Sequence, residues 1–414
     1  MKLIYPILFI SIFLNSLALE AQTITSSPYS MYGIGDIVPN GFGQSKAMGG
    51  AGIAMSSNLW LNNINPASYH SIDSLFFLLE AGIDGRQSTF SNGIQKQSNH
   101  NINFSYFALA FRITPWWSNS LGLAPFSSVG NNINTTKAIE GSSENFNVNL
   151  QGTGGINQYY WGNSFKIVKD LYVGLNISYL LGTIKQTESL TSGYFSGSLT
   201  TEDKMTLNKL YFNYGIQYSF NINKNIKTTL GGIFGNKDQM GLKHDVTIFG
   251  NANDTLEHNV IQQSSFTLPQ YFGLGASVKF GDKLLLASDY KFYNWSQSES
   301  LQPNVKFVNS TNYCIGAEFM PSTSFRASYI AKMKYRLGGY LNNSYLMIQG
   351  QQIRDMGLSA GIGVPISNKF YISLAYQIGQ RGAVKNNGLI TEKYQTLMFN
   401  VSFADIWFLK PKFD

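Results

Sequence analysis

The stretch DLYVGLNISYLLG, residues 170–182, alternates between two kinds of side chain. Its odd positions are apolar and comprise Leu171, Val173, Leu175, Ile177, Tyr179 and Leu181. Its even positions are small or polar and include Gly174, Asn176, Ser178 and Gly182. Because successive side chains of a β-strand point to opposite faces, this pattern predicts a strand with one apolar face and one small, polar face.

The same period of two recurs in KLYFNYGIQYSF (209–220), YFGLGASVKF (271–280) and KFYISLAYQIG (369–379). A soluble sandwich also alternates, but its polar face points to water and is usually rich in charged residues. Here the second face is mostly Gly, Ser, Asn, Gln and Ala. That composition suits the polar lumen of a transmembrane barrel whose apolar face meets lipid. Aromatic clusters near residues 116–117, 159–161 and 290–295 are candidates for the girdles at the two membrane surfaces.

The spacing of turns predicts an antiparallel barrel of about fourteen strands. Six short turns are expected at ITPWW, VKDL, NINKN, FGDK, MPSTS and ISNK. Seven longer polar links are expected near residues 90–100, 137–143, 191–196, 250–257, 299–304, 337–351 and 384–390. The alternating segments exceed the roughly 9–11 residues that span a bilayer, so the strands should project outward. Closure into a barrel removes the exposed edges that an open sheet would have.

Composition argues against several function classes. Aromatic residues make up 14% of the 414 residues and charged residues only 13%, against about a quarter in typical soluble domains. The net charge is +7, but Lys and Arg are scattered, so nucleic acid is not an expected partner. No histidine pair has metal-ligating spacing and no nucleophile elbow is present, so we expect no metal, no cofactor and no enzyme. His244-Asp245 leaves a rim-located hydrolase as the least favoured alternative.

The N-terminus has the order of a secretory signal. Lys2 precedes the apolar run LIYPILFISIFLNSLAL, and small residues offer a cleavage point after Ala18 or Ala21. We therefore expect a signal peptide over residues 1–21 and export of the remaining chain. No later apolar run is long enough for a transmembrane helix. The single cysteine, Cys314, permits no intrachain disulfide.

Three segments resemble the long-chain fatty-acid transporter (FadL-like) family of outer-membrane barrels. The first is MGGAGIAMSSNLWLNNINPASY (48–69), which ends in the Asn-Pro-Ala motif of Asn65, Pro66 and Ala67. The second is residues 268–296, where the family's pattern is matched by Leu268, Pro269, Asp282, Lys283, Asp289, Trp295 and Ser296. The third pairs residues 314–333 with 358–379. One departure is that Ser56, Ser57 and Asn58 stand where the family usually has acidic residues and an Ala-rich run.

The resemblance implies that residues 22–73 form a hatch inside the lumen and residues 74–414 the barrel. A segment that fills a lumen must be compact and must not bury unpaired charge. Gly49, Gly50 and Gly52 permit tight turns, Asn side chains can bond to loop backbone, and Pro66 fixes the chain direction. Apolar residues such as Ile53 in the same stretch favour packing over a surface linker.

Alternation places a set of charges on the lumenal face, namely Glu80, Asp84, Arg86, Asp289, Lys291, Glu318 and Arg326. Such charges can tune selectivity, or they can pair with one another and hold the hatch. Pro125, in LGLAPFSSVG, is the candidate for a kink in the wall, because proline interrupts a strand ladder.

What the resemblance implies about function is a transporter in the outer membrane of a Gram-negative bacterium. Hydrophobic molecules such as long-chain fatty acids would enter an apolar groove, the hatch would rearrange, and the ligand would leave sideways through the wall. Membrane lipids and hydrophobic small molecules would be its partners. The alternative is a non-transporting barrel subunit or adaptor of an outer-membrane protein secretion or assembly complex. Residues 338–357 are a candidate docking or substrate loop in either case.

Overall fold

The computed structural model describes residues 27–39, 41–138, 145–191, 198–250, 254–298, 305–324, 326–367, 369–383 and 389–406. The predicted signal peptide, residues 1–21, and the first residues of the predicted hatch lie outside these ranges. Within them, none of the helices has the length and apolar character that crossing a membrane requires.

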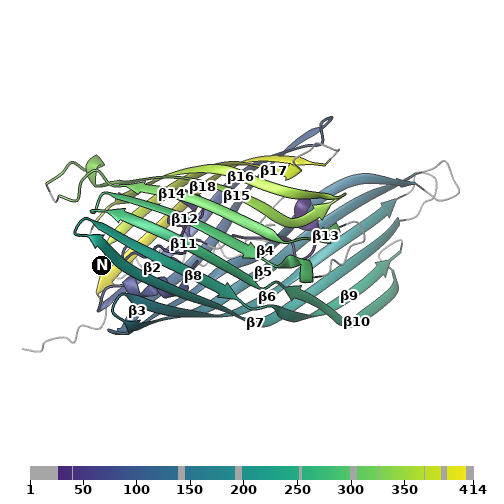
Figure 1. The fold of residues 1–414 in the computed structure, drawn as a ribbon. Coiled ribbons are helices and arrows are strands. Elements are labelled where there is room, and N and C mark those ends of the chain that lie inside the picture. Colours follow the sequence, from purple (N-terminus) through teal and green to yellow (C-terminus); the bar gives the residue numbers. More distant parts are fainter. Residues whose placement is uncertain are drawn as a thin grey trace, which may run out of the picture.

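The wall is a closed, antiparallel barrel of long, tilted strands (Figure 1). Its strands are β2 (Phe76–Ser91), β3 (Lys96–Thr114), β4 (Trp117–Ala138), β5 (Asn145–Val168), β6 (Leu171–Thr191), β7 (Ser198–Asn223), β8 (Ile226–Gly235), β9 (Asp238–Phe249), β10 (Thr255–Leu268), β11 (Tyr271–Phe280), β12 (Leu284–Tyr293), β13 (Val305–Phe307), β14 (Ser310–Phe319), β15 (Lys334–Ile348), β16 (Gln351–Pro365), β17 (Phe370–Ala383) and β18 (Thr391–Ile406). β18 pairs with β2 and closes the barrel.

These seventeen described elements make fourteen wall strands, because three pairs continue one another. β8 and β9 form one wall strand, because they pair with successive parts of β7. β10 and β11 form the next, because β11 pairs with β8 and β10 pairs with β9. β13 and β14 form a third, because both pair with β15. The predicted barrel of about fourteen antiparallel strands is therefore confirmed.

The N-terminal segment, residues 27–39 and 41–74, runs inside this wall (purple in Figure 1). Its short elements are η2 (Pro28–Met31), β1 (Asp36–Ile37), α2 (Gly43–Ala47) and η3 (Pro66–Ser71). Two further 3-10 turns, η5 (Trp295–Gln297) and η6 (Ile330–Lys332), lie between wall strands.

The height of the membrane can be read from the outward faces of β6 and β7. On β6 these residues are apolar from Leu171 to Leu181 and become polar at Thr183 and Lys185. On β7 they are apolar from 210 to 220 and polar below 209. The register pairs Tyr179 with Leu210, so both changes fall at the same level. The apolar parts match the roughly 9–11 residues that a tilted strand needs to span a bilayer.

Beyond that level, one side of the wall continues as an open sheet, the outer sheet, made by the far parts of β4, β5, β6, β7, β9 and β10. β7 is 26 residues long, and its residues 198–209 lie beyond this level. β3 pairs with β4 only from Phe107↔Leu123 to Thr114↔Trp117. The outer sheet therefore has one edge at β4 and another at β10.

The segment from β14 to β16 differs from the sequence prediction. The predicted short turn at MPSTS is a long connection, residues 320–333, that contains η6. The predicted link at 337–351 is instead the hairpin of β15 and β16, turned at Gln349 and Gly350, which both have positive φ. The candidate docking loop 338–357 belongs to this hairpin, and its Leu346 and Ile353 are fully buried. Gly338 and Gly339 lie inside strand β15 rather than in a loop.

Arg326 is consequently misplaced by the sequence prediction. It lies in the 320–333 connection and is exposed, not lumenal. Apolar and polar residues alternate in this connection as they do in a strand. Alternation predicts which residues share a face if a strand forms, but it does not show that the backbone pairs with a neighbouring strand.

Glycines of the wall let the N-terminal segment approach it closely. A Cβ added at Gly338 of β15 would lie 2.2 Å from the backbone nitrogen of Gly49, and one at Gly174 of β6 would lie 2.3 Å from that of Ala67. Comparable contacts under 3.0 Å with the segment occur at Gly162, Gly215, Gly231, Gly273, Gly275, Gly316 and Gly361. We call these nine residues the glycine belt. It spreads over most of the circumference, so the segment fills the lumen as part of the core.

We expect Gly338→Val to push the N-terminal segment away from β15. Overpacking of this kind costs about 1–3 kcal/mol of folding free energy. The variant should unfold at lower temperature in detergent and should conduct ions across a planar bilayer more than the native protein does. Gly339→Val is the matched control, because a Cβ there first meets the Leu358 side chain at 3.3 Å. Equal conductance in both variants would contradict a sealed lumen.

Candidate functional site

The Asn-Pro-Ala motif joins the N-terminal segment to the wall. Asn65 caps η3 because its side-chain oxygen accepts a hydrogen bond from the backbone N–H of Ala67 at 3.0 Å. Its amide nitrogen donates to the carbonyl of Ile53 at 2.7 Å and to that of Ile216 on β7 at 3.0 Å. Asn65 thus connects two parts of the segment and one wall strand. Pro66 and Ala67 are fully buried against Gly174.

The three predicted glycines lie where the segment turns against β15, β16 and β12. Gly49 and Gly50 have φ of 70° and 86°, a backbone conformation that side chains disfavour. The N–H of Gly49 donates to the hydroxyl of Ser359 at 2.9 Å. Gly52 has an ordinary φ, and a Cβ there would lie 2.5 Å from the Ile64 side chain, so close packing explains it.

Two buried carboxylates of the wall bind the backbone of the segment. Asp289 accepts hydrogen bonds from the N–H groups of Gly52 at 2.7 Å and Ile53 at 2.9 Å. Glu80 accepts from the N–H of Leu61 at 2.7 Å and from the Tyr106 hydroxyl at 2.7 Å. Both carboxyl groups are buried, and in a buried environment such hydrogen bonds are electrostatically stronger than they are in water.

The other predicted lumenal charges lie among wall residues. Arg86 pairs with Glu392 at 2.7 Å, and Glu318 pairs with Arg336 at 2.7 Å. Asp84 accepts a hydrogen bond from Ser105. Lys291 is buried two residues beyond Asp289 on the same face of β12. The sequence left two roles open for these charges. The contacts described here are those of the second role, in which charges pair with one another and bind the segment.

The sequence analysis missed Arg336, Arg381 and Glu392. Arg336 is only 2% exposed and lies in a stretch interpreted as the end of the preceding strand and the start of a loop. Arg381 and Glu392 flank the β17–β18 connection, where a strand's end cannot be fixed from sequence.

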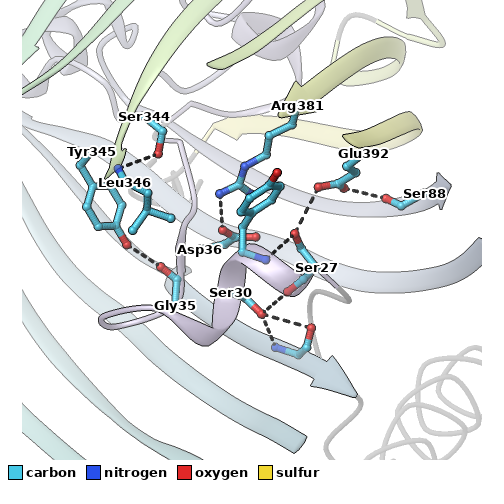
Figure 2. A network of polar contacts seen from close by, with 12 residues as sticks. Ser27, Ser30, Gly35, Asp36, Ser88, Ser344, Tyr345, Leu346, Arg381 and Glu392 are labelled. Carbon is cyan, nitrogen blue, oxygen red and sulfur yellow. Dashed lines mark hydrogen bonds and ion pairs between the residues drawn. The ribbon is translucent and has the colours of Figure 1, made fainter. Parts of the chain in front are cut away.

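Arg381 and Glu392 form polar contacts with the beginning of the N-terminal segment (Figure 2). Arg381 of β17 pairs with Asp36 at 2.7 Å, and the Ser27 hydroxyl donates to Glu392 of β18 at 3.2 Å. On the opposite side, the Tyr345 hydroxyl donates to the carbonyl of Gly35 at 3.0 Å. These contacts tie this end of the segment to β15, β17 and β18 (Figure 2).

At the other end of the lumen, His70 of η3 stacks on Tyr172, with ring centroids 3.5 Å apart. Its Nδ1–H donates to the carbonyl of Ala67 at 2.7 Å. The stacking and this hydrogen bond hold the end of η3 against β6.

β3 and β4 separate at Pro125. The β4–β5 ladder has a bulge between Pro125 and Ser127, and above this point β4 no longer pairs with β3. β1 of the N-terminal segment takes the place of β3, with Ile37 opposite Ser127 and Asp36 opposite Ser128. Pro125 therefore marks the place where the wall changes from a strand to the segment.

A surface depression with a volume of about 740 Å³ lies on the outward face of the wall. Leu274, Tyr290, Tyr313 and Ile315 line it from β11, β12 and β14. These residues face lipid rather than lumen, so the depression is not a site inside the barrel.

Comparison with known proteins identifies one matching family and many similar structures. A family model described as BamG matches residues 3–414. No curated protein matches the chain.

Three solved structures show the same fold at low identity. The toluene transporter TbuX of Ralstonia pickettii is 14% identical, with 88% of this chain and 98% of that chain covered and a TM-score of 0.56. A FadL homologue of Pseudomonas aeruginosa is 11% identical, with 90% and 99% covered and a TM-score of 0.58. The toluene transporter TodX of Pseudomonas putida is 15% identical, with 90% and 100% covered and a TM-score of 0.54. The predicted FadL-like fold is thereby confirmed.

We expect the amide of Leu61 to report on Glu80. Glu80→Leu removes both acceptors and leaves a buried donor unpaired, which costs about 1–3 kcal/mol, whereas Glu80→Gln keeps one acceptor. Hydrogen exchange at Leu61 should therefore rise from native to Gln to Leu. Exchange at Gly52 and Ile53, which Asp289 binds, is the internal control. An unchanged Leu61 amide in Glu80→Leu would contradict the role of this carboxylate.

Proposed function

We propose that this chain, which belongs to the BamG family, is a plugged barrel that serves as a subunit or adaptor of an outer-membrane protein secretion or assembly complex. It would reside in the outer membrane of a Gram-negative bacterium, with lipid around its apolar span and no catalytic role. The observation that carries this proposal is the packing of the N-terminal segment on the glycine belt.

At membrane level, that packing buries the segment against the wall, so a transported molecule would have to displace it. The segment's Met48, Ala51, Ile53 and Ala67 have 0% exposure. Moving the segment would break the bonds to Glu80 and Asp289 and the ion pair of Asp36 with Arg381. A barrel so filled is well suited to act through its outer surfaces.

The outer sheet supplies such a surface. It stands beyond the apolar span, ends in two strand edges, and is supported from inside by a hydrophobic core that includes Phe266, Trp295 and Leu346. A rigid projection of this kind can hold a second protein close to the membrane.

Native purification tests the proposal directly. From its own membranes in mild detergent, the chain should emerge in a heteromeric assembly of fixed stoichiometry by native mass spectrometry. Depletion of the chain should lower the amounts of other folded barrels in the outer membrane. A lone barrel that carries bound lipid or other hydrophobic molecules would contradict the proposal.

Uptake of hydrophobic compounds such as long-chain fatty acids is the second candidate, favoured by the separation of β3 and β4 at Pro125. TbuX and TodX, which share the fold, are toluene transporters. In this reading β1 would leave β4 when the hatch rearranges, and the ligand would pass sideways between β3 and β4.

A reversible cross-link separates the two candidates. Ile37→Cys with Ser127→Cys, in a Cys314→Ala background, would join opposed residues of β1 and β4. If the chain transports, the oxidised protein should stop uptake of a fluorescent long-chain fatty acid into cells, and a reductant should restore it. Uptake that the oxidised cross-link leaves intact would contradict exit between these strands.

A further inference from the structure

We propose that the free edge of β10, over Thr255–Ile261, binds an extended segment of a partner protein by adding it as a further β-strand outside the membrane. β10 pairs with β9 along its length, and over these residues no second strand among the described residues pairs with it. An unpaired edge presents alternate N–H and C=O groups to the side, which is the recognition surface for strand addition. This inference rests on the proposed role as a subunit and identifies where the partner would bind.

The side chains of this edge are unusual for a strand left in water. Leu256, Val260 and Ile261 are 63%, 46% and 44% exposed, and every residue from 255 to 261 is exposed. The edge holds neither lysine nor proline, and its one charged side chain, Glu257, accepts a hydrogen bond from the Asn259 amide at 2.6 Å on the same strand. Apolar side chains beside unpaired backbone suit a partner strand that would cover both.

The other free edge of the outer sheet provides the contrast. The far part of β4 reads Asn131, Asn132, Ile133, Asn134, Thr135, Thr136, Lys137 and Ala138. Lys137 also pairs with Glu188 across β5. The β4 edge has the polar residues and the lysine that discourage pairing, whereas the β10 edge has exposed apolar residues. This difference is expected if only the β10 edge binds a partner strand.

The position of the edge excludes lipid as the occupant. β9, the neighbour of β10, pairs with β7 over Thr200–Leu207, which lies beyond the apolar span that ends at Leu210. Figure 1 shows the β9–β10 hairpin at the end of the barrel opposite the β3–β4 turn. Extended protein backbone is therefore the chemistry that can satisfy this edge.

Geometry also excludes a second copy of the chain. Two copies in one membrane would be related by a two-fold axis along the membrane normal. Barrel strands are inclined by roughly 35–45° to that normal, so the two β10 strands would cross at about 70–90°. Paired strands are rotated by only about 20–25°, so no ladder could form. The occupant is then a flexible, extended segment of a different protein, with an apolar side chain placed to cover Val260.

Hydrogen exchange on two preparations tests this inference. In protein purified from its own membranes, amides of 255–261 that point away from β9 should exchange slowly, and in protein refolded alone they should exchange fast. The β4 edge, 131–138, should exchange fast in both. Equal, fast exchange of 255–261 in both preparations would overturn the inference, and would leave the proposed function intact if the heteromeric assembly is still present.

A photo-crosslinking residue at His258 identifies the occupant. The expected adduct joins His258 to one extended segment of another protein, and the same residue placed at Thr136 should give none. Val260→Lys with Leu256→Lys should abolish the His258 adduct, whereas Asn134→Lys on the polar edge should not. An adduct with a second copy of this chain, or an adduct that the lysine substitutions leave unchanged, would overturn the inference.

Discussion

An irregular backbone inside a barrel needs a hydrogen-bond partner for each of its buried N–H and C=O groups, and this requirement shapes the whole lumen. Regular strands satisfy one another, but the N-terminal segment has no long ladder of its own. The wall supplies the missing partners, with Asp289 and Glu80 as acceptors and Ser359 beside Gly49. Both carboxyl groups are buried, and each accepts hydrogen bonds from backbone N–H groups of the segment, which satisfies those donors inside the barrel.

Close approach is the second consequence of the same requirement. A side chain can reach a backbone N–H only if the two backbones lie near each other, and on the wall that proximity depends on glycine. Gly338 meets Gly49 while Ser359 on the neighbouring strand binds the same residue. Gly215 likewise lies against Asn65, whose amide reaches the carbonyl of Ile216. Glycines on the inner face therefore let the segment's backbone come close to the wall, and the polar side chains between them can then bond to that backbone.

The sequence allowed the fold to be predicted well, because alternation and turn spacing are local signals. The barrel, its strand number and the placement of Glu80 and Asp289 follow from parity along single strands. The partners of those charges do not, because they depend on which segment fills the lumen. Arg326 and Arg336 show where prediction from alternation fails. Arg326 lies in an alternating stretch but is exposed, whereas Arg336, close to Gly338 and Gly339, is buried. Parity indicates a face only after the strand has been located.

The separation of β3 from β4 links the inner and outer parts of the molecule. Because β3 stops pairing at Phe107, the far part of β4 becomes an edge, and β1 of the segment pairs with its first exposed residues. β4 covers the rest of its edge with asparagine, threonine and lysine, whereas β10, on the other side of the same sheet, leaves apolar residues exposed. Two edges that arise from one open sheet are thus treated differently. A segment of the chain itself occupies part of the first, and the chemistry of the second calls for a segment from outside.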